Sequence, residues 1–205
     1  MYLTKIKLNT KNKTVIYNMG NCEWVHKLLM ESGFGNIQAS NARKTIQLLY
    51  SMEEDTILMQ SAIKPSFSVN EGLFAVNPRT IDVSKLESIC KNGNVIRFKC
   101  TCNPTKRTKE GKRVFLKTPE ERSEWIKRTL LKNGATVLIE DQTPESTVFG
   151  IKSNKEDGTK HKIYAKTVTF AGALRIENGE LFWKAVCEGI GREKAYGCGM
   201  IMIMR

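Results

Sequence analysis

The predicted fold closes with a glycine-rich stretch, Gly189-Ile190-Gly191-Arg192-Glu193-Lys194-Ala195-Tyr196-Gly197-Cys198-Gly199, which runs into the apolar residues 200–204. Four glycines among eleven residues let backbone amides approach a ligand closely, and Arg192 and Lys194 stand among them. The hydrophobic pattern predicts a helix over 177–188 before this stretch and a strand over 199–204 after it. The stretch therefore predicts a loop that faces phosphate, with an ordinary glycine-rich turn as the alternative.

The glycine spacing excludes two familiar nucleotide-binding loops. A dinucleotide fingerprint requires a glycine three residues after its second glycine, and that position is Lys194. A Walker loop ends in Gly-Lys-Ser/Thr, whereas Met200 follows Gly199. The sequence therefore predicts no nucleotide cofactor.

Positive charge is concentrated in the middle of the chain. The 205 residues carry 33 basic and 21 acidic side chains and a net charge of +12, and residues 91–133 alone hold thirteen basic and four acidic ones. Such a concentration predicts a polyanionic partner. A membrane surface is not favoured, because no apolar segment approaches 18 residues and no basic amphipathic helix stands out. The N-terminal residues show no apolar signal core, so a cytoplasmic location is expected.

The cysteines and histidines form no metal-binding pattern. Six cysteines are scattered without a CxxC pair, and the two histidines have no HExxH-like spacing. Cys100 and Cys102 are two residues apart, so on a strand they face the same side and are interpreted as core filling. We expect no cofactor, and a chemistry that is metal-free or uses a loosely held ion.

The first half of the chain shows the order strand, helix, strand, strand, helix, strand. Strands are expected at 2–8, 44–52, 56–63 and 94–102, and helices at 22–32 and 83–90. Asn21 is suited to cap the first helix and Gly33 to end it, while the acidic residues 53–55 form the hairpin turn. This order is typical of a ferredoxin-like domain.

The second half of the chain shows a similar order of predicted strands and helices, although no sequence repeat links the two halves. Thr118, Pro119 and Glu121 form a capping box that starts a helix, and Gly134 ends it. Strands are expected at 137–140, 148–152, 160–170 and 171–176, before the last helix and the closing strand. We therefore predict an α+β protein of two tandem ferredoxin-like (RRM-like) βαββαβ domains, at residues 1–103 and 104–205.

Three further motifs precede the glycine-rich stretch in a fixed order. They are Arg97-Phe98-Lys99-Cys100-Thr101-Cys102-Asn103-Pro104-Thr105-Lys106-Arg107, Gly111-Lys112-Arg113-Val114 and Val168-Thr169-Phe170-x-Gly172-x-Leu174. In this combination the sequence closely resembles the CasE family, the CRISPR-associated endoribonucleases of type I-E systems in the RAMP superfamily. Residues 1–5 and 60–62 extend the resemblance over nearly the whole chain.

The resemblance implies a function in CRISPR RNA processing. A protein of this family binds a CRISPR repeat hairpin and cuts the precursor RNA 3′ of the stem, without a metal, by attack of the ribose 2′-OH on the scissile phosphate. It then retains the guide RNA beside the other subunits of the Cascade complex. The alternative is a non-catalytic or weakly catalytic RNA-hairpin-binding subunit of such a complex.

A third, less favoured function is that of a metal-dependent nuclease with its carboxylates among Glu53, Glu54 and Asp55. A solvated turn is the favoured interpretation of these three residues. Loss of cleavage in EDTA would support the nuclease instead.

The resemblance also implies a catalytic residue. The family's catalytic histidine lies on the first helix in a Tyr-x-x-His motif, and His26 matches it. Its expected role is general acid or base. Glu23 occupies the tyrosine position, with Trp24 beside it. Three consequences are open: Glu23 supports the imidazole directly, Tyr17 substitutes for the missing tyrosine, or cleavage is slow.

RNA contacts are expected from three groups of residues. The first is the central basic run, residues 106–113, and the second is the hairpin around the turn 155–158, which also carries Lys152, Lys155 and His161. The third is the glycine-rich stretch. For the basic run and the hairpin, a solvated surface is the alternative. The residues predicted to bind RNA are Lys106, Arg107, Lys112, Arg113, Lys160, Lys162, Gly189, Gly191, Arg192, Lys194, Gly197 and Gly199.

Overall fold

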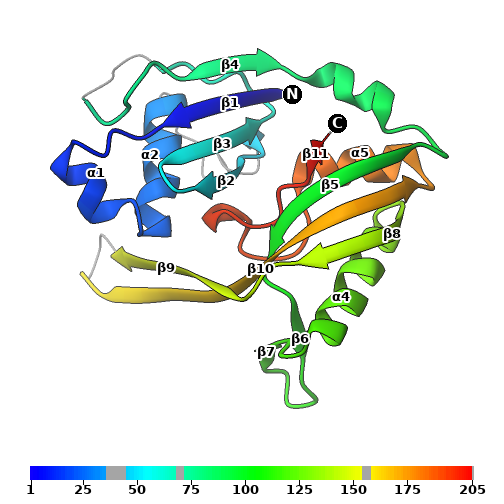
Figure 1. Ribbon diagram of the computed structural model, residues 1–205. Helices are drawn as coiled ribbons and strands as arrows, with labels where there is room; N and C mark the ends of the chain where they lie inside the picture. Colours follow the sequence, from blue (N-terminus) through cyan, green and yellow to red (C-terminus); the bar gives the residue numbers. More distant parts are fainter. Residues whose placement is uncertain (36–44, 68–71, 154–157, 205) are drawn as a thin grey trace. The chain divides into compact units, whose positions relative to one another are not determined.

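A computed structural model describes residues 1–35, 45–67, 72–153 and 158–204, and it shows two compact units (Figure 1). Unit 1 comprises Met1–Ser84, Thr147–Ala165 and Ala195–Gly197, and unit 2 comprises Lys85–Ser146, Lys166–Lys194 and Cys198–Arg205. The chain therefore passes between the units several times. The predicted division placed one boundary between residues 103 and 104.

Unit 1 contains a four-stranded antiparallel sheet in the order β2-β3-β1-β4. The strands are β1 (Tyr2–Lys7), β2 (Leu49–Glu53), β3 (Thr56–Ser61) and β4 (Arg79–Asp82). The predicted hairpin of β2 and β3 is confirmed, and Glu54 adopts the positive φ of 53° that its tight turn requires. Thr45 and Ile46 are helical, so β2 begins later than predicted, and Lys44 lies outside the described residues.

Helices α1 (Lys13–Asn18) and α2 (Cys22–Phe34) belong to unit 1. The predicted stripe of α2, Val25, Leu28 and Leu29, is buried and shares a core with residues of β1 and β3 such as Ile6 and Met59. The predicted end at Gly33 is wrong, because the helix continues to Phe34. A Cβ at Gly33 would lie 3.4 Å from Pro65 and 3.5 Å from Phe67, which is ordinary van der Waals contact, so packing does not require glycine at this position.

The predicted strand 94–102 exists as β5 (Val95–Cys102), but it pairs with β10 and β11 in unit 2. The prediction that it closes the first domain is therefore wrong. The position beside β1 is occupied by β4, a short strand with no buried residue and hence no hydrophobic alternation to detect. The predicted helix at 83–90 is a 3₁₀ helix, η1 (Ser84–Ile89).

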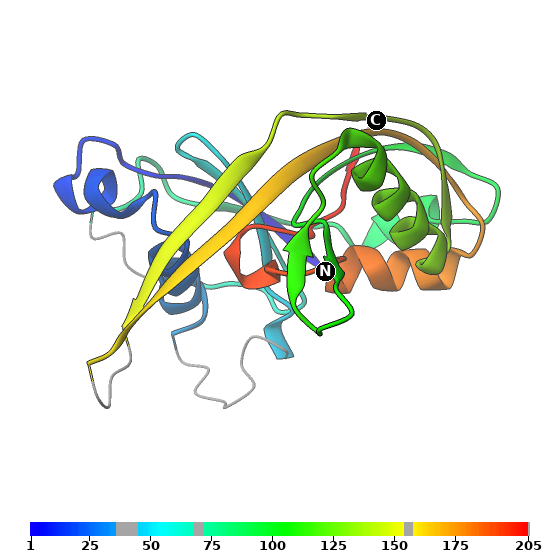
Figure 2. The same cartoon turned by 90° about the horizontal axis from the view of Figure 1, so that it is seen from below.

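Unit 2 contains a second antiparallel sheet in the order β11-β5-β10-β8. Its strands are β8 (Ala135–Gln142), β11 (Met202–Met204) and β10 (Lys160–Ile176), which also pairs with β9 (Ser146–Ser153). The predicted strands 160–170 and 171–176 are thus one long strand, and Figure 2 shows it running beside β9 as a hairpin. A Cβ at Gly172 would lie 2.0 Å from the Ile139 carbonyl oxygen, so only glycine allows the close approach of β8 here.

The helices of unit 2 are α4 (Pro119–Lys132) and α5 (Gly179–Glu188). The predicted capping box of α4 is confirmed, and Gly134 at φ 80° follows its C-cap Asn133. Cys100 and Cys102 are buried on one side of β5 with their sulfurs 3.3 Å apart, as predicted for core residues. The hydrogen bond from Cys100 and burial together raise the pKa of Cys102. Between β5 and α4, the basic run contains the short strands β6 (Thr105–Arg107) and β7 (Arg113–Phe115).

Candidate functional site

His26 lies on α2 within unit 1, and the predicted cap fixes the N-terminus of this helix. The Asn21 side chain accepts hydrogen bonds from the N–H groups of Glu23 (3.1 Å) and Trp24 (3.4 Å). His26 is half-buried, as expected for a residue on the flank of the apolar stripe. Glu23 and Lys27 lie one helical turn from each other on the same side of the helix.

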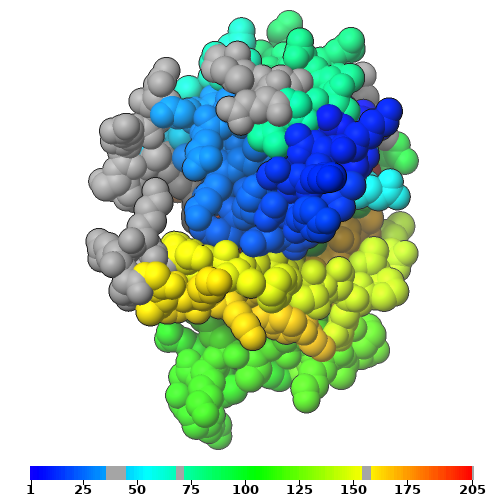
Figure 3. All heavy atoms as spheres, turned by 90° about the vertical axis from the view of Figure 1, so that its left-hand side faces the viewer, coloured from blue at the N-terminus to red at the C-terminus, as the bar shows by residue number. Residues whose placement is uncertain are grey.

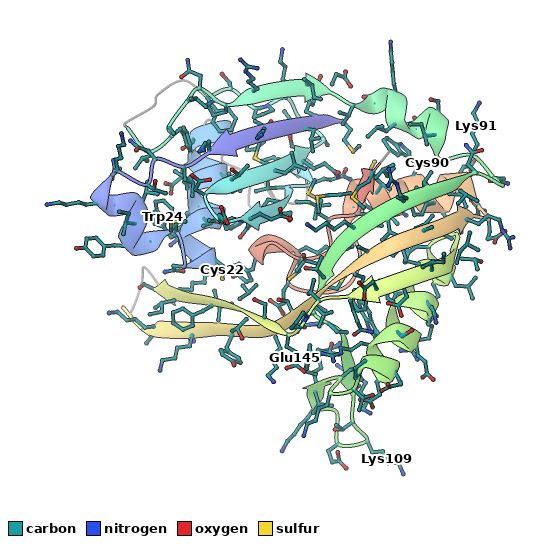
Figure 4. The ribbon with its side chains drawn as sticks, viewed as in Figure 1. Cys22, Trp24, Cys90, Lys91, Lys109 and Glu145 are labelled. Atoms are coloured by element: carbon teal, nitrogen blue, oxygen red, sulfur yellow. The ribbon has the colours of Figure 1, made fainter. Side chains whose placement is uncertain are left out.

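The hairpin of β9 and β10 meets the N-terminus of α2. The N–H of Ile151 donates to the Asn21 side-chain oxygen at 3.2 Å. A Cβ at Gly150 would lie 2.7 Å from the sulfur of Cys22, so glycine is required for this approach. Figure 4 labels Cys22 at the start of α2, and Figure 3 shows atoms of the N-terminal helices beside atoms of the hairpin. This contact brings the neighbouring residue Lys152 towards the helix.

A cavity of about 390 Å³ lies beside His26, and all the residues that line it belong to unit 1. We call it the His26 cavity. It combines an imidazole, a phenol, two lysines and two carboxylates. The lining residues are Glu23, His26, Lys27, Met30, Glu31, Lys152, Ala195 and Tyr196.

Glu23 is only 5% exposed, and both of its carboxylate oxygens have partners. The Tyr196 hydroxyl donates to Oε2 at 3.2 Å, and Lys27 Nζ lies 3.5 Å from Oε1. The Tyr196 ring also meets His26 edge to face, with ring centroids 6.3 Å apart and an interplanar angle of 81°. The cation and the phenol offset the negative charge of Glu23 next to the cavity.

The tyrosine in the cavity is Tyr196, whereas the sequence had suggested Tyr17. Tyr17 lies on α1, is 81% exposed and does not line the cavity. Sequence reasoning missed Tyr196, since no local spacing links it to α2. The only available signal was its place within the glycine-rich stretch.

Gly197 fixes the backbone next to Tyr196. Its φ is 82°, and a Cβ would lie 3.2 Å from the ring of Tyr50. The Tyr50 hydroxyl in turn donates to the Cys22 carbonyl oxygen at 3.5 Å. Gly197, predicted to contact RNA, therefore has a packing role that places Tyr196 at the cavity.

Several other predicted RNA-binding groups of the glycine-rich stretch are engaged within unit 2. The N–H of Gly189 donates to Ala185 O at 2.8 Å, and that of Gly199 donates to Thr101 O at 2.7 Å. Lys194 Nζ donates to the carbonyl oxygens of Glu188 (2.9 Å) and Gly189 (2.7 Å), which caps α5. These two amides are therefore not directed at a ligand, which corrects that part of the prediction. Gly191 and Arg192 are exposed.

The central basic run forms the short hairpin of β6 and β7, and Lys106, Arg107, Lys112 and Arg113 are all exposed. Arg107 and Arg113 face each other across the hairpin, while Lys106 is paired with Glu121 at 2.6 Å. Figure 4 labels Lys109 at the tip of this hairpin. The repulsion between the facing arginines would be relieved by an anion.

The β9–β10 hairpin presents a second group of exposed cations. Lys152, Lys160, His161 and Lys162 are exposed, whereas Lys155 lies outside the described residues. Lys152 alone among them lines the His26 cavity.

The described residues contain no group of three or more His, Cys, Asp or Glu side chains placed to hold a metal ion. The acidic residues 53–55 form the turn between β2 and β3, where Asp55 lies 3.8 Å from Lys7. In the part of the chain that the structure describes, no helix is long and apolar enough to cross a membrane.

Comparisons with known proteins identify the family of this chain. The chain belongs to the CRISPR associated protein family, whose model matches residues 1–205. It is 27% identical over 213 residues to the CRISPR-associated endoribonuclease Cse3 of Thermus thermophilus, with 99% of each chain covered. The resemblance found in the sequence is thereby confirmed.

Two solved structures share the fold over essentially the whole chain. A CRISPR endoribonuclease Cse3 bound to a 19-nucleotide RNA matches with a TM-score of 0.82 and 24% identity, covering 100% of both chains. A chain of a CRISPR RNA-guided surveillance complex in a pre-nicking state matches with a TM-score of 0.70 and 25% identity, covering 99% of both chains. These matches support a mixed α/β fold with antiparallel sheets for this chain.

Proposed function

We propose that the protein is an endoribonuclease that binds the CRISPR repeat hairpin and cleaves precursor CRISPR RNA 3′ of the stem. The observation that carries the proposal is the position of His26, half-buried in a cavity that also holds Lys27 and Lys152. The full-length relationship to an endoribonuclease supports the same conclusion. A histidine beside two cations suits proton transfer at a phosphodiester.

The proposed mechanism uses the RNA's own 2′-OH as nucleophile and requires no metal. Oxygen O2′ forms a bond to phosphorus while the bond to O5′ breaks, which leaves a 2′,3′-cyclic phosphate and a 5′-OH. His26 moves a proton at O2′ or at the leaving O5′, a contribution of roughly 10² to 10⁴ in rate. Lys27 and Lys152 stabilise the negative charge that develops on the phosphate oxygens.

The proposal for the fold is a pair of tandem ferredoxin-like domains with a revised boundary. In unit 2, β5, α4, β8, β10, α5 and β11 follow one another in the order strand, helix, strand, strand, helix, strand, and the sheet order is β11-β5-β10-β8. Unit 1 has the matching sheet order β2-β3-β1-β4. Between β3 and β4 the described residues, 62–67 and 72–78, contain no helix. The second domain would therefore begin before β5, near Lys85 rather than residue 104.

RNA binding is proposed for the exposed cations of the β6–β7 hairpin, for Lys160 and Lys162, and for Arg192 with Gly191. A-form RNA hides its base edges in a narrow major groove, so recognition would depend on the shape of the hairpin and on its phosphates. Retention of the guide RNA with other Cascade subunits is supported by the similarity to a chain of an RNA-guided surveillance complex.

The test is an incubation of repeat-hairpin RNA with the protein in EDTA, using the wild type and His26→Ala. We expect the wild type to cut the RNA in EDTA, and His26→Ala to bind it without cutting. Tightly bound, intact RNA with the wild type would instead support the non-catalytic subunit, which Glu23 in the family's tyrosine position favours. Cutting that is lost in EDTA would support a metal-dependent nuclease.

A further inference from the structure

We propose that Tyr196 is a positioning residue of the His26 cavity: anchored on Glu23, it orients the imidazole of His26 and tunes its basicity. This inference rests on the proposed function and extends it to a residue on a distant part of the chain. Tyr196 contacts two residues of α2, Glu23 and His26, within unit 1. Its hydroxyl donates to Glu23 Oε2, and its ring lies edge to face with His26.

The backbone on either side of Tyr196 fixes the position of its phenol ring. Tyr196 ends the 3₁₀ turn η2 (Lys194–Tyr196), Ala195 before it is buried, and Gly197 after it packs against Tyr50 with a positive φ. Tyr50 is in turn hydrogen-bonded to the Cys22 carbonyl oxygen at the start of α2. The ring of Tyr196 is therefore placed relative to the same helix that carries His26, which is the condition for a positioning role.

The geometry predicts the sign of an electrostatic effect. The charged groups that line the cavity around the imidazole are Glu23 and Lys27, one turn away from each other on the helix, Glu31 further along it, and Lys152 from the hairpin. A carboxylate near an imidazole favours its protonated form. The Tyr196 hydroxyl donates to Glu23 and so weakens that influence. Removal of the Tyr196 hydroxyl leaves the Glu23 carboxylate less solvated, so its negative charge acts more strongly on His26. The pH at the midpoint of the His26 titration should therefore rise.

The variant Tyr196→Phe tests this role because it keeps the ring and removes the hydroxyl. Tyr17→Phe is the matched control, since Tyr17 is exposed and lies outside the cavity. Three quantities are measured for the wild type and both variants: the single-turnover rate of repeat-hairpin cleavage, the affinity for the uncleaved RNA, and the His26 titration by NMR without RNA. His161, exposed on β10, is the internal reference.

For Tyr196→Phe we expect cleavage about tenfold slower, an RNA affinity unchanged within about twofold, and a His26 midpoint higher by about half a unit. Tyr17→Phe should match the wild type in all three. Glu23→Gln keeps an acceptor for the phenol but removes the charge, and it should lower the midpoint. This opposite shift is not expected of a merely structural change.

An unchanged cleavage rate and midpoint in Tyr196→Phe would overturn the positioning role while leaving the proposed function intact. A parallel loss of rate and affinity without a shift of the midpoint would overturn it as well, because it would indicate a structural defect. A wild type that leaves RNA intact contradicts the proposed function. Even then, a His26 midpoint that rises in Tyr196→Phe and falls in Glu23→Gln would support the positioning role on its own.

Discussion

The side-chain oxygen of Asn21 accepts a hydrogen bond from the N–H of Ile151 at 3.2 Å, across 130 residues of sequence. The same oxygen caps α2 through the N–H groups of Glu23 and Trp24. One side chain thus fixes both the helix that carries His26 and the strand that carries Lys152. The positions of His26 and Lys152, which both line the His26 cavity, therefore depend on the Asn21 side-chain oxygen.

Asn21→Ala should therefore destabilise unit 1 more than an ordinary loss of a cap. A lost N-cap costs about 1 kcal/mol, and the unpaired Ile151 N–H adds about 1 kcal/mol more. Asn178→Ala is the control, because the Asn178 side chain caps α5 by accepting from the Leu181 N–H. Urea unfolding measures both variants. Equal losses of stability in the two would contradict the double role of Asn21.

Gly150→Ala should weaken the contact between the hairpin and α2. The added Cβ would lie 2.7 Å from Cys22 Sγ and 2.9 Å from Asn21 Oδ1, so the strand must move away. Overpacking of this kind costs about 1–3 kcal/mol. Gly20→Ala is the control, since a Cβ there meets nothing within 4 Å. Thermal unfolding compares the variants, and cleavage activity should fall with Gly150→Ala because Lys152 is displaced. A Gly150→Ala protein as stable and active as Gly20→Ala would show that this close approach is dispensable.

Local signals were sufficient to predict much of this fold. The capping box at Thr118 and Glu121 and the cap at Asn21 require only short spacings, and both are present. It was harder to predict from the sequence which strands pair with each other in each sheet. β5 has a clear alternation that marks it as a strand but not its partners, while β4 has no buried residue and leaves no pattern. Pairing is decided by tertiary packing, which propensity does not encode.

The candidate site was predicted only in part for the same reason. His26 and Glu23 lie within one turn of a helix, so their proximity follows from helical geometry. Tyr196 reaches Glu23 across 173 residues, and no spacing rule predicts such a contact. The glycines were recognised as special, but the sequence could not separate a glycine that approaches a ligand from one that packs against a ring, as Gly197 does against Tyr50.

Glu145 should make the stability of unit 2 depend on pH. Hydrogen bonding and charge attraction from Lys166, with a smaller contribution from Arg122, lower the pKa of Glu145. A carboxyl whose folded pKa is depressed stabilises the fold above its unfolded pKa, and this contribution is lost as the pH falls through the folded pKa. We expect Glu145→Gln to lower stability at about pH 7 and to flatten the acid limb of the stability profile.

The matched control for that change is Glu124→Gln, on the outer surface of α4. Urea unfolding between about pH 7 and about pH 3 measures both. Arg122 is only 7% exposed, so its loss of a partner should be visible at neutral pH. If Glu145→Gln keeps the wild-type pH profile, the ion pairs do not contribute to stability.

The arginines that face each other on the β6–β7 hairpin provide a test of RNA binding. Arg107 and Arg113 are opposite each other in the strand register and exposed, and neither forms an ion pair with the residues that the structure describes. Replacing both by alanine therefore removes two charges without breaking such a pair. Each lost phosphate contact reduces the slope of log affinity against log salt by about 0.9. We expect the double variant to bind repeat RNA more weakly and with a slope smaller by about 2. Lys127→Ala with Arg128→Ala on α4 is the control of equal charge, and an equal loss of affinity there would assign the effect to net charge rather than to this hairpin.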